Sequence, residues 1–380
     1  MQKTAIITWN SFYNYGTCLQ AYALQQYILS LGYDNYIVDD STIVYGASLE
    51  SAKYKFVNKC KLRWTKLWQS LHANYRAFYK YQRVLVPAIH HFKANVLKID
   101  YDIVSILNDV CDYDVYICGS DQIWSPGMLE NPKGCFFFAS FTKKRKISYA
   151  ASIGRYEIPQ EWKAKVMDLI IPFSAISVRE EAGQRALQEL SNQKVELVVD
   201  PTLLLNKQEW EELLPSQKAS TEKYVLGYIL TPNTRFYQIA REYAHQHGMR
   251  FYLFMLNIED YGEADQLISG GPFDFLQYVR DAEMVFTDSY HGTIFATIFE
   301  TPFYTFKRFT DDSPINQNSR IETLLSSMGA TNRLIEGMHK HQETADAIDF
   351  AEIKGRLNPL IEHSKGFLQD ALANNNKKIQ

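Results

Sequence analysis

The chain has 380 residues, of which 46% are hydrophobic and 22% are charged, and its formal net charge is −3. This composition is typical of a folded globular protein, and the length favours two domains. The near-neutral charge argues against nucleic-acid binding, because that function needs a strongly basic face.

The cysteines and the N-terminus bear on the compartment. The five cysteines are odd in number and include no C-x-x-C pair. We interpret them as reduced thiols, which predicts neither a disulfide framework nor a metal site of the zinc type. The start of the chain is interrupted by polar residues too soon for a signal peptide, and no uncharged apolar run reaches membrane-spanning length. A cytoplasmic location is therefore expected.

The chain opens with a strand and a helix. Residues 4–8 form an apolar run typical of a buried strand, and residues 17–31 repeat apolar side chains at helical spacing. The loop between them contains Asn14, Tyr15 and Gly16 but no G-x-G-x-x-G, so an NAD-type dinucleotide site is not expected. These three residues either line a ligand crevice or form an ordinary loop between a strand and a helix.

Residues 51–99 differ from the rest of the chain because they contain many Lys and Arg residues but no Asp or Glu. Trp64, Leu67, Trp68 and Leu71 recur among them at helical spacing. A basic amphipathic helix with Trp can lie on an anionic membrane surface, which suggests peripheral contact with the inner face of the membrane. The alternative is a helical excursion whose apolar face packs on the protein itself.

Several strands of the first half end in polar residues. These strand ends carry Asp121, Ser152, Arg179 and Asp200. Because loops at one edge of a parallel sheet converge, we expect the four side chains to face a common cleft. The alternative for Arg179 is a salt bridge with a nearby acid.

A polar stretch at 205–222 marks a domain boundary, and a second α/β unit follows it. Strands are predicted at 224–230, 251–256 and 303–305, and the tail at 347–373 is mostly helical.

The clearest candidate site lies at 284–299, which predicts a strand, a turn and a helix. Ligands of open α/β sheets bind at the carboxyl ends of the strands. Gly292 lets the backbone approach a ligand, and the free N–H groups of the next helical turn favour an anion. His291 is placed to donate or accept a proton near neutral pH. The alternative is that Asp288 or Ser289 only caps the helix.

Six short blocks resemble, in order, the polysaccharide pyruvyl transferase family. They are Asn14-Tyr15-Gly16-Thr17 with Leu19-Gln20-Ala21-Tyr22-Ala23-Leu24, Gly119-Ser120-Asp121-Gln122-Ile123-Trp124, Ser148-Tyr149-Ala150-Ala151-Ser152, Ser177-Val178-Arg179-Glu180, Asp200-Pro201-Thr202-Leu203-Leu204 and Thr287-Asp288-Ser289-Tyr290-His291-Gly292. Each block is unspecific alone, but the ordered set is specific, and it spans most of the chain.

The resemblance implies an α/β fold of two Rossmann-like domains that face each other across a cleft, as in GT-B glycosyltransferases. Together with the helical tail, it predicts a first domain at 1–205 containing the basic excursion 51–99, a second domain at 206–345 and a C-terminal helix within 346–380. The implied activity is transfer of a pyruvyl group from phosphoenolpyruvate to two hydroxyls of a sugar. The acceptor would be a polysaccharide or its lipid-linked precursor, and the product a cyclic ketal.

In the family, an Arg of the first domain and an Arg-Leu-His segment of the second hold phosphoenolpyruvate. Arg179 matches the first Arg and His291 matches the His, but Ser289-Tyr290 stands where Arg-Leu is typical. One cation is therefore missing. Arg320, or Lys307 with Arg308, is expected to replace it, unless the donor differs.

The resemblance and the residue chemistry together assign the roles. The expected catalytic residues are His291 and Asp121, the donor-binding residues Arg179, Ser289, Gly292 and Arg320, and the acceptor-binding residues Asn14, Tyr15 and Gly16. Acid–base catalysis suffices for this reaction, so no metal and no redox cofactor are expected. Two alternative functions remain, a GT-B glycosyltransferase that uses a nucleotide sugar and a non-catalytic saccharide-binding protein.

Overall fold

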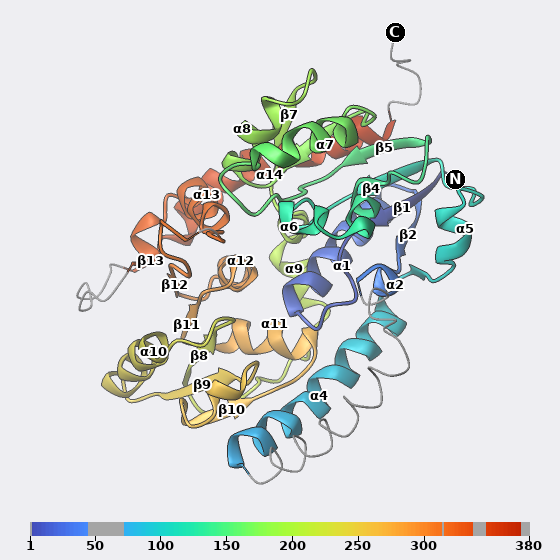
Figure 1. Cartoon of the computed structure of the whole chain (residues 1–380). Helices are drawn as coiled ribbons and strands as arrows, with labels where there is room; N and C mark the ends of the chain where they lie inside the picture. The colour runs from blue at the N-terminus through green and yellow to red at the C-terminus, as the bar shows by residue number, and fades with distance from the viewer. Residues whose placement is uncertain (1, 45–71, 314, 337–346, 374–380) are drawn as a thin grey trace.

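The computed structural model describes residues 2–44, 72–313, 315–336 and 347–373. Within these ranges the chain forms two α/β domains, each built on a parallel sheet, and a long C-terminal helix (Figure 1). None of the described helices combines the length and apolar character needed to cross a membrane.

The first domain is built on a five-stranded parallel sheet in the order β3-β2-β1-β4-β5. The strands are β1 (Lys3–Ile7), β2 (Asp34–Val38), β3 (Ile99–Asp100), β4 (Val115–Cys118) and β5 (Arg145–Ser148). Isolated parallel bridges from Ile147 to Ala175 and from Ala151 to Val178 extend it to a further pair, β6 (Ile176–Val178) and β7 (Val195–Leu197). This is the strand order of Rossmann-type sheets.

The helices of the first domain connect these strands. They are α1 (Tyr15–Ser30), α2 (Ser41–Val44), α5 (Ile103–Leu107), α6 (Pro126–Leu129), η2 (Pro132–Phe138), α7 (Gln160–Ile170) and α8 (Glu181–Gln188). The N-terminus of α1 is capped by Asn14, whose side chain accepts a hydrogen bond from the Thr17 N–H at 3.2 Å. Such a cap fixes the point at which the first loop turns into the helix.

The second domain repeats the same topology with six parallel strands in the order β10-β9-β8-β11-β12-β13. The strands are β8 (Tyr224–Tyr228), β9 (Arg250–Phe254), β10 (Gln266–Ile268), β11 (Met284–Thr287), β12 (Phe303–Phe306) and β13 (Leu334–Ile335). The helical elements are η3 (Pro201–Leu203) and α9 (Lys207–Glu211) in the link between the domains, then η4 (Ile258–Asp260), α10 (Thr234–Gln246), α11 (Pro272–Asp281), α12 (Tyr290–Phe299), α13 (Ser319–Met328) and η5 (Thr331–Arg333). Every residue of β8 and β11 is buried, as expected for parallel strands covered on both faces.

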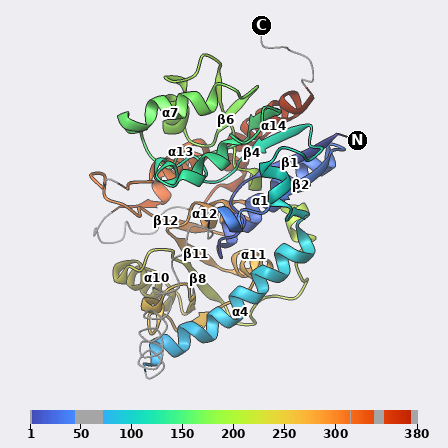
Figure 2. The same ribbon diagram turned by 45° about the vertical axis from the view of Figure 1, so that its right-hand side comes forward.

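Two long helices join the domains. Helix α4 (Ala73–Val96) belongs by sequence to the first domain but lies along the second, as Figures 1 and 2 show. Its Tyr81 hydroxyl donates to the carbonyl of Leu267 at 3.0 Å, and its Phe92 ring packs edge-on against Phe273. The helical half of the basic excursion is thus packed on the protein. The Trp64–Leu71 half lies outside the described residues.

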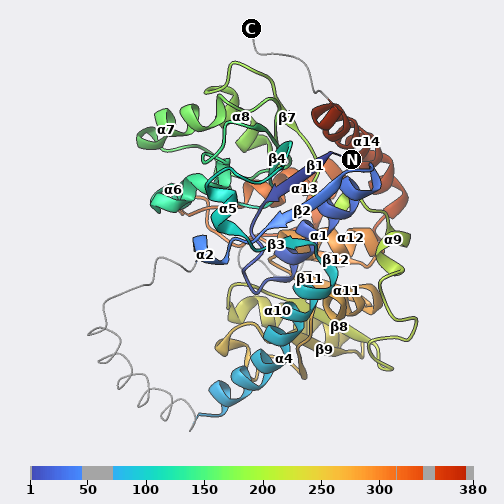
Figure 3. The same ribbon diagram turned by 90° about the vertical axis from the view of Figure 1, so that its right-hand side faces the viewer.

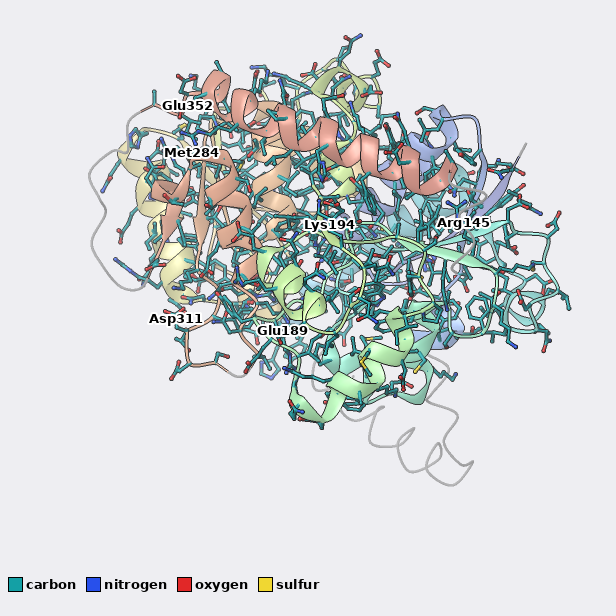
Figure 4. The ribbon with its side chains drawn as sticks, turned by 90° about the horizontal axis from the view of Figure 1, so that it is seen from above. Arg145, Glu189, Lys194, Met284, Asp311 and Glu352 are labelled. Carbon is teal, nitrogen blue, oxygen red and sulfur yellow. The ribbon has the colours of Figure 1, made fainter. Side chains whose placement is uncertain are left out.

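Helix α14 (Phe350–Ala373) follows the second domain in the sequence but packs against the first. Seen from above in Figure 4, it runs from Glu352, on the side of Met284 and the second domain, towards Arg145 in the first. The Arg145 guanidinium donates to the carbonyl of Leu372 at 3.0 Å, and the Ser364 hydroxyl accepts from the Val199 N–H at 2.9 Å. The side view in Figure 3 places α14 beside the first domain.

One hydrophobic cluster runs through both domains. At its centre the Tyr15 ring of α1 stacks on Phe275 with ring centroids 5.0 Å apart, and contacts Tyr228 and Phe254 at 5.8 and 5.3 Å. The Tyr15 hydroxyl donates to the carbonyl of Gly270 at 3.0 Å. The loop before α1 is therefore anchored to the second domain, where the carboxyl ends of the two sheets meet.

Candidate functional site

A cavity of about 320 Å³ lies between the domains, and we call it the interdomain cavity. From the first domain it is lined by Trp9, Asn14, Thr17, Asp121 and Gln122. From the second it is lined by Leu230, Asp288, Ser289, Tyr290, His291, Arg308, Phe309, Gln317, Asn318, Arg320 and Ile321. The fold thus brings five predicted site residues to one place: Asn14, Asp121, Ser289, His291 and Arg320.

Arg179 lies behind the interdomain cavity and is not among the residues that line it. Its side chain is fully buried, its Nη1 donates to Asp200 Oδ2 at 2.6 Å, and its Nη2 donates to Asp121 Oδ1 at 2.8 Å. Arg179 therefore forms salt bridges, which was the alternative to a place in the cleft. The two acids come from other strand ends, so Arg179 holds three loops of the first domain together. The direct grip on the donor that the resemblance implies does not fit this placement.

The two carboxylates beside Arg179 stay ionised. Burial by itself would raise the pKa of Asp121, but the electrostatic influence of the neighbouring Arg179, His291 and Arg320 outweighs it and holds the pKa below its usual range. Burial is likewise outweighed at Asp200, where His291 and Arg179 lower the pKa. The second oxygen of Asp121 accepts from the Thr17 hydroxyl at 3.0 Å. A carboxylate with a lowered pKa stays ionised and can accept hydrogen bonds, but it is a weak base, which argues against Asp121 as the group that removes a proton.

His291 sits between Asp200 and the first turn of α1. Its Nε2 lies 3.5 Å from Asp200 Oδ2, and its Nδ1 edge faces Gly16 so closely that a Cβ on that glycine would lie 2.2 Å from Nδ1. Both contacts come from the first domain, whereas His291 belongs to the second. They flank the imidazole on two sides, although its Nε2 makes no hydrogen bond to the described residues. Gly16 acts by leaving room for the ring and does not line the cavity.

Tyr290 separates two guanidinium groups. Arg179 lies 4.6 Å and Arg320 5.9 Å from the centroid of its ring, distances that allow cation–π attraction. Arg320 is only 9% exposed, and its Nη2 donates to Gln317 Oε1 at 3.0 Å. Its Nε has no hydrogen-bond partner in the part of the chain that the structure describes. Burial, followed by repulsion from Arg179, lowers the pKa of Arg320 to about 10.

The turn before α12 completes the wall. The Ser289 hydroxyl caps this helix by accepting from the Gly292 N–H at 3.3 Å, so the capping alternative holds for Ser289. Asp288 does not cap it, because its carboxylate accepts from the backbone N–H groups of Leu230 and Thr231 at 2.6 and 3.0 Å. Arg308 stands over this carboxylate, with Nε 3.7 Å from Asp288 Oδ2.

Three expected residues lie elsewhere. Tyr15 is buried in the core between the domains. A Cβ on Gly292 would lie 2.4 Å from Thr287 Oγ1, so this glycine serves close packing of the helix on β11. Lys307, a suggested replacement for the missing cation, pairs with Asp311 at 2.9 Å and Glu336 at 3.0 Å.

Other wall residues were not predicted. Trp9, Gln317 and Asn318 carry no motif that could single them out, whereas Gln122 belongs to the block Gly119-Ser120-Asp121-Gln122-Ile123-Trp124 but was given no role. Asp200 was expected as a strand end and as the start of the block Asp200-Pro201-Thr202-Leu203-Leu204, but it was given no role in the site. Its carboxylate accepts from the Thr202 N–H at 3.1 Å and so caps the short helix η3. Among the described residues no cluster of His, Cys, Asp or Glu has a geometry that could hold a metal ion.

Replacing Gly16 with Ala is expected to impair the site more than the fold. The added methyl group must push His291 off Asp200, so any proton transfer by His291 should slow at least tenfold, while overpacking costs about 1–3 kcal/mol of stability. Turnover assays and urea denaturation measure the two effects. Gly355→Ala in α14, where nothing lies within 4 Å of the new Cβ, is the matched control and should leave both unchanged or raise stability slightly. Unchanged turnover in Gly16→Ala would contradict this packing role.

Comparison with solved structures shows that the fold is GT-B-like. The structures of similar fold include UDP-GlcNAc 2-epimerase from Methanocaldococcus jannaschii (TM-score 0.50, 10% identity, 95% of this chain and 93% of that chain). They also include a glycosyltransferase from Rickettsia africae ESF-5 (TM-score 0.51, 9% identity, 98% and 100%) and HepE from Anabaena in complex with UDP and glucose (TM-score 0.50, 8% identity, 98% and 100%). At such low identity the likeness concerns the fold alone, which is GT-B-like as expected.

Comparison of the sequence is more specific. A search of curated protein sequences gives no significant match. The family model described as polysaccharide pyruvyl transferase matches residues 14–308, from the capping residue of α1 to the arginine over Asp288. Because this match covers most of the chain and includes residues from both walls of the interdomain cavity, the chain belongs to the polysaccharide pyruvyl transferase family.

Proposed function

We propose that this chain transfers a pyruvyl group from phosphoenolpyruvate to a pair of hydroxyls on a sugar of a polysaccharide or its lipid-linked precursor. The observation that supports the donor most directly is Arg320. It is a buried guanidinium in the cavity wall, it has an unpartnered Nε, and no acid forms an ion pair with it among the described residues. An unpaired buried cation is costly, and an anionic ligand would offset that cost.

The donor would lie against three features of the second domain. Arg320 and Arg308 would contact its phosphate and carboxylate, and the first turn of α12, at Ser289, offers backbone N–H groups to an anion. In this proposal Arg320 and Arg308 supply the charge that Arg-Leu supplies elsewhere in the family. Arg179 would not touch the donor, and its role would be to hold Asp121 and Asp200 in place.

The chemistry needs one group that moves protons. We propose that His291 donates a proton to the methylene carbon of phosphoenolpyruvate, which makes C2 electrophilic. The oxygen of the first sugar hydroxyl bonds to C2, and its proton passes to His291, which regenerates the acid. The C2–O bond to phosphate then breaks with its electrons leaving on the phosphate, and the second hydroxyl closes the ketal as its proton passes to the departing phosphate. Asp200 orients the imidazole from 3.5 Å. Asp121, kept ionised by its lowered pKa, would accept a hydrogen bond from the attacking hydroxyl and orient it without removing its proton.

The acceptor would enter from the side of the first domain. Asn14 lines the cavity, and its Oδ1 is engaged as a helix cap, which leaves the amide Nδ2 without a partner among the described residues. This free donor faces the same space as Asp121 and Trp9. The proposal retains Asn14 as the acceptor-side contact of the loop before α1 and assigns Tyr15 and Gly16 to packing.

The decisive experiment measures phosphate release from phosphoenolpyruvate with a panel of saccharides, with mass spectrometry of the products. We expect Arg320→Met to weaken phosphoenolpyruvate binding roughly 10- to 100-fold in calorimetry, which corresponds to loss of a charged hydrogen bond. Arg356→Met, an arginine of α14 that pairs on the surface with Glu352, is the matched control and should bind normally. Equal binding by both variants would remove Arg320 from the donor site. Consumption of a UDP-sugar in place of phosphoenolpyruvate would favour the nucleotide-sugar alternative.

A further inference from the structure

A second cavity adjoins the interdomain cavity on the side of helix α4. It has a volume of about 240 Å³ and shares Asn14 and Leu230 with the interdomain cavity, so the two are neighbours across these residues. We call it the α4 cavity. Its walls come from three places: the loop before α1, helix α4, and the ends of β8 and β9 in the second domain. Its place beside the reaction cavity suits it to hold a further part of the same substrate.

The α4 cavity differs from its neighbour in charge. No charged side chain is found among its described lining residues, whereas Asp121, Asp288, Arg308 and Arg320 line the interdomain cavity. An anionic ligand is therefore favoured only in the latter. The α4 cavity combines ring faces with amides, and this combination suits a neutral sugar, whose C–H faces pack on rings and whose hydroxyls bond to polar groups.

Helix α4 lines this space with three side chains, Phe78, Gln82 and Leu85, of which the first two offer a ring and an amide. Phe78 is half-buried and lies one helical turn before Gln82, so both belong to one face of the helix. The Gln82 amide makes no hydrogen bond to the described residues, which leaves a donor and an acceptor at the wall. Opposite them, the Tyr13 ring is 45% exposed, and its hydroxyl is 3.1 Å from His90 Nε2 on the same helix. This contact ties the loop to α4 and keeps the walls facing each other.

Helix α4 is held firmly enough to position these side chains. Leu85, Ile89 and Phe92 bury its apolar face, and the Ser269 hydroxyl donates to the carbonyl of Tyr81 at 3.0 Å. The helix belongs to the basic excursion, which the catalytic proposal does not use. A firmly packed insertion that lines a cavity next to a reaction site is a natural place for substrate recognition.

We propose that the α4 cavity binds a neutral sugar unit of the acceptor, next to the sugar that receives the pyruvyl group, and that Gln82 and Phe78 determine specificity for it. This inference rests on the proposed function, since it takes the acceptor to be a saccharide that reaches the interdomain cavity. The volume, below the roughly 300–1,000 Å³ of sites for drug-sized ligands, indicates a single sugar ring.

The test compares short and long acceptors. The probes are methyl glycosides of glucose, galactose, mannose and N-acetylglucosamine and their neutral disaccharides, used with phosphoenolpyruvate. Gln82→Ala and Phe78→Leu should each raise KM for the best disaccharide about 3- to 10-fold, as expected for one neutral hydrogen bond or packing contact. KM for the matching methyl glycoside and for phosphoenolpyruvate should not change. Val84→Ala, at a site on α4 that is 49% exposed, is the matched control and should behave as wild type.

Direct binding separates this inference from the proposed function. Saturation-transfer NMR of the same disaccharides, without phosphoenolpyruvate, should show contact with wild type and a weaker signal with Gln82→Ala, while circular dichroism confirms that the variant is folded. If pyruvyl transfer occurs and both variants keep wild-type KM for disaccharides, the α4 cavity is not an acceptor site and the proposed function stands. If no transfer occurs, the proposed function fails, and disaccharide binding that Gln82→Ala leaves unchanged would also overturn the role of α4.

Discussion

Replacing Arg179 with Met is expected to lower the free energy of unfolding by about 3–5 kcal/mol at neutral pH, since it leaves buried charges without their partner. The guanidinium donates to Asp121 at 2.8 Å and to Asp200 at 2.6 Å, and all three side chains are buried. Urea denaturation measures the loss. The free energy of unfolding of Arg179→Lys should lie between those of wild type and Arg179→Met, because one ammonium group cannot reproduce the planar fork that reaches both carboxylates.

The loss of unfolding free energy caused by Arg179→Met should depend on pH. In wild type the pKa values of Asp121 and Asp200 are lowered, so both groups contribute stability that is present above their unfolded pKa of about 3.9 and lost as the pH falls through the lower folded values. In the Arg179→Met variant the guanidinium no longer opposes the effect of burial, so burial raises these pKa values. As the pH falls, protonation of the two carboxylates removes their unpaired charges, and this restores part of the variant's stability. The difference between the two proteins should therefore be largest near pH 7 and shrink in acid.

The matched control for this experiment is Arg185→Met on helix α8. Arg185 is 67% exposed and forms a surface pair with Glu181, so its loss should cost less than about 1 kcal/mol at any pH. If Arg179→Met were as stable as Arg185→Met, the ion pairs with Asp121 and Asp200 would contribute nothing to the fold.

Replacing His291 with Gln is expected to reduce turnover by roughly 10²–10⁴-fold, because glutamine keeps polarity but cannot transfer a proton. Donor binding should change little, since the proposed anion contacts come from Arg320, Arg308 and the first turn of α12. Rapid-quench measurement of pyruvyl transfer and calorimetry of phosphoenolpyruvate binding record the two quantities. The opposite pattern, weak binding with normal turnover, is expected for Arg320→Met.

His363→Gln provides the comparison for His291. His363 is a half-exposed residue of α14 that lies 3.4 Å from Glu196, far from the interdomain cavity in the fold. This variant should keep wild-type turnover. Wild-type turnover in His291→Gln would remove the imidazole from the mechanism, and equal losses in both variants would indicate a general effect on the fold.

The elements with a strong local pattern could be predicted from the sequence. The apolar runs at β4 and β11 and the helical spacing in α1 each carry enough residues to be recognised. The strands β3 and β13 have two residues each, too few to form a pattern. These strands are defined by pairing with their neighbours, a tertiary effect that a local pattern does not contain.

The site was predictable in position more than in detail. His291, Asp121 and Asn14 follow or begin elements whose ends must converge, so their meeting could be inferred from topology. The partners of Arg179 could not be chosen, because Asp121 lies 58 and Asp200 21 positions away and neither is its nearest acid in sequence. Only the packed structure shows that these contacts take up both terminal nitrogens.

Helix α4 shows a second limit of sequence reasoning. The sequence indicates the apolar face of α4 and its basic charges, but it does not indicate the surface that the apolar face covers. That surface, η4 and α11 of the second domain, is more than 160 residues further along the chain, and hydrophobic burial does not specify its partner in advance.

The opposed courses of α4 and α14 limit how this enzyme can open. In a two-domain protein with a single connecting segment, the halves can swing apart about one hinge. Here one helix of the first domain is fastened to the second, and the last helix is fastened back to the first through Val199 and Arg145. A wide swing would have to break both attachments and the Tyr15 stack between them. Ligand binding in the interdomain cavity should therefore be accompanied by only small rotations of the domains and not by a wide opening.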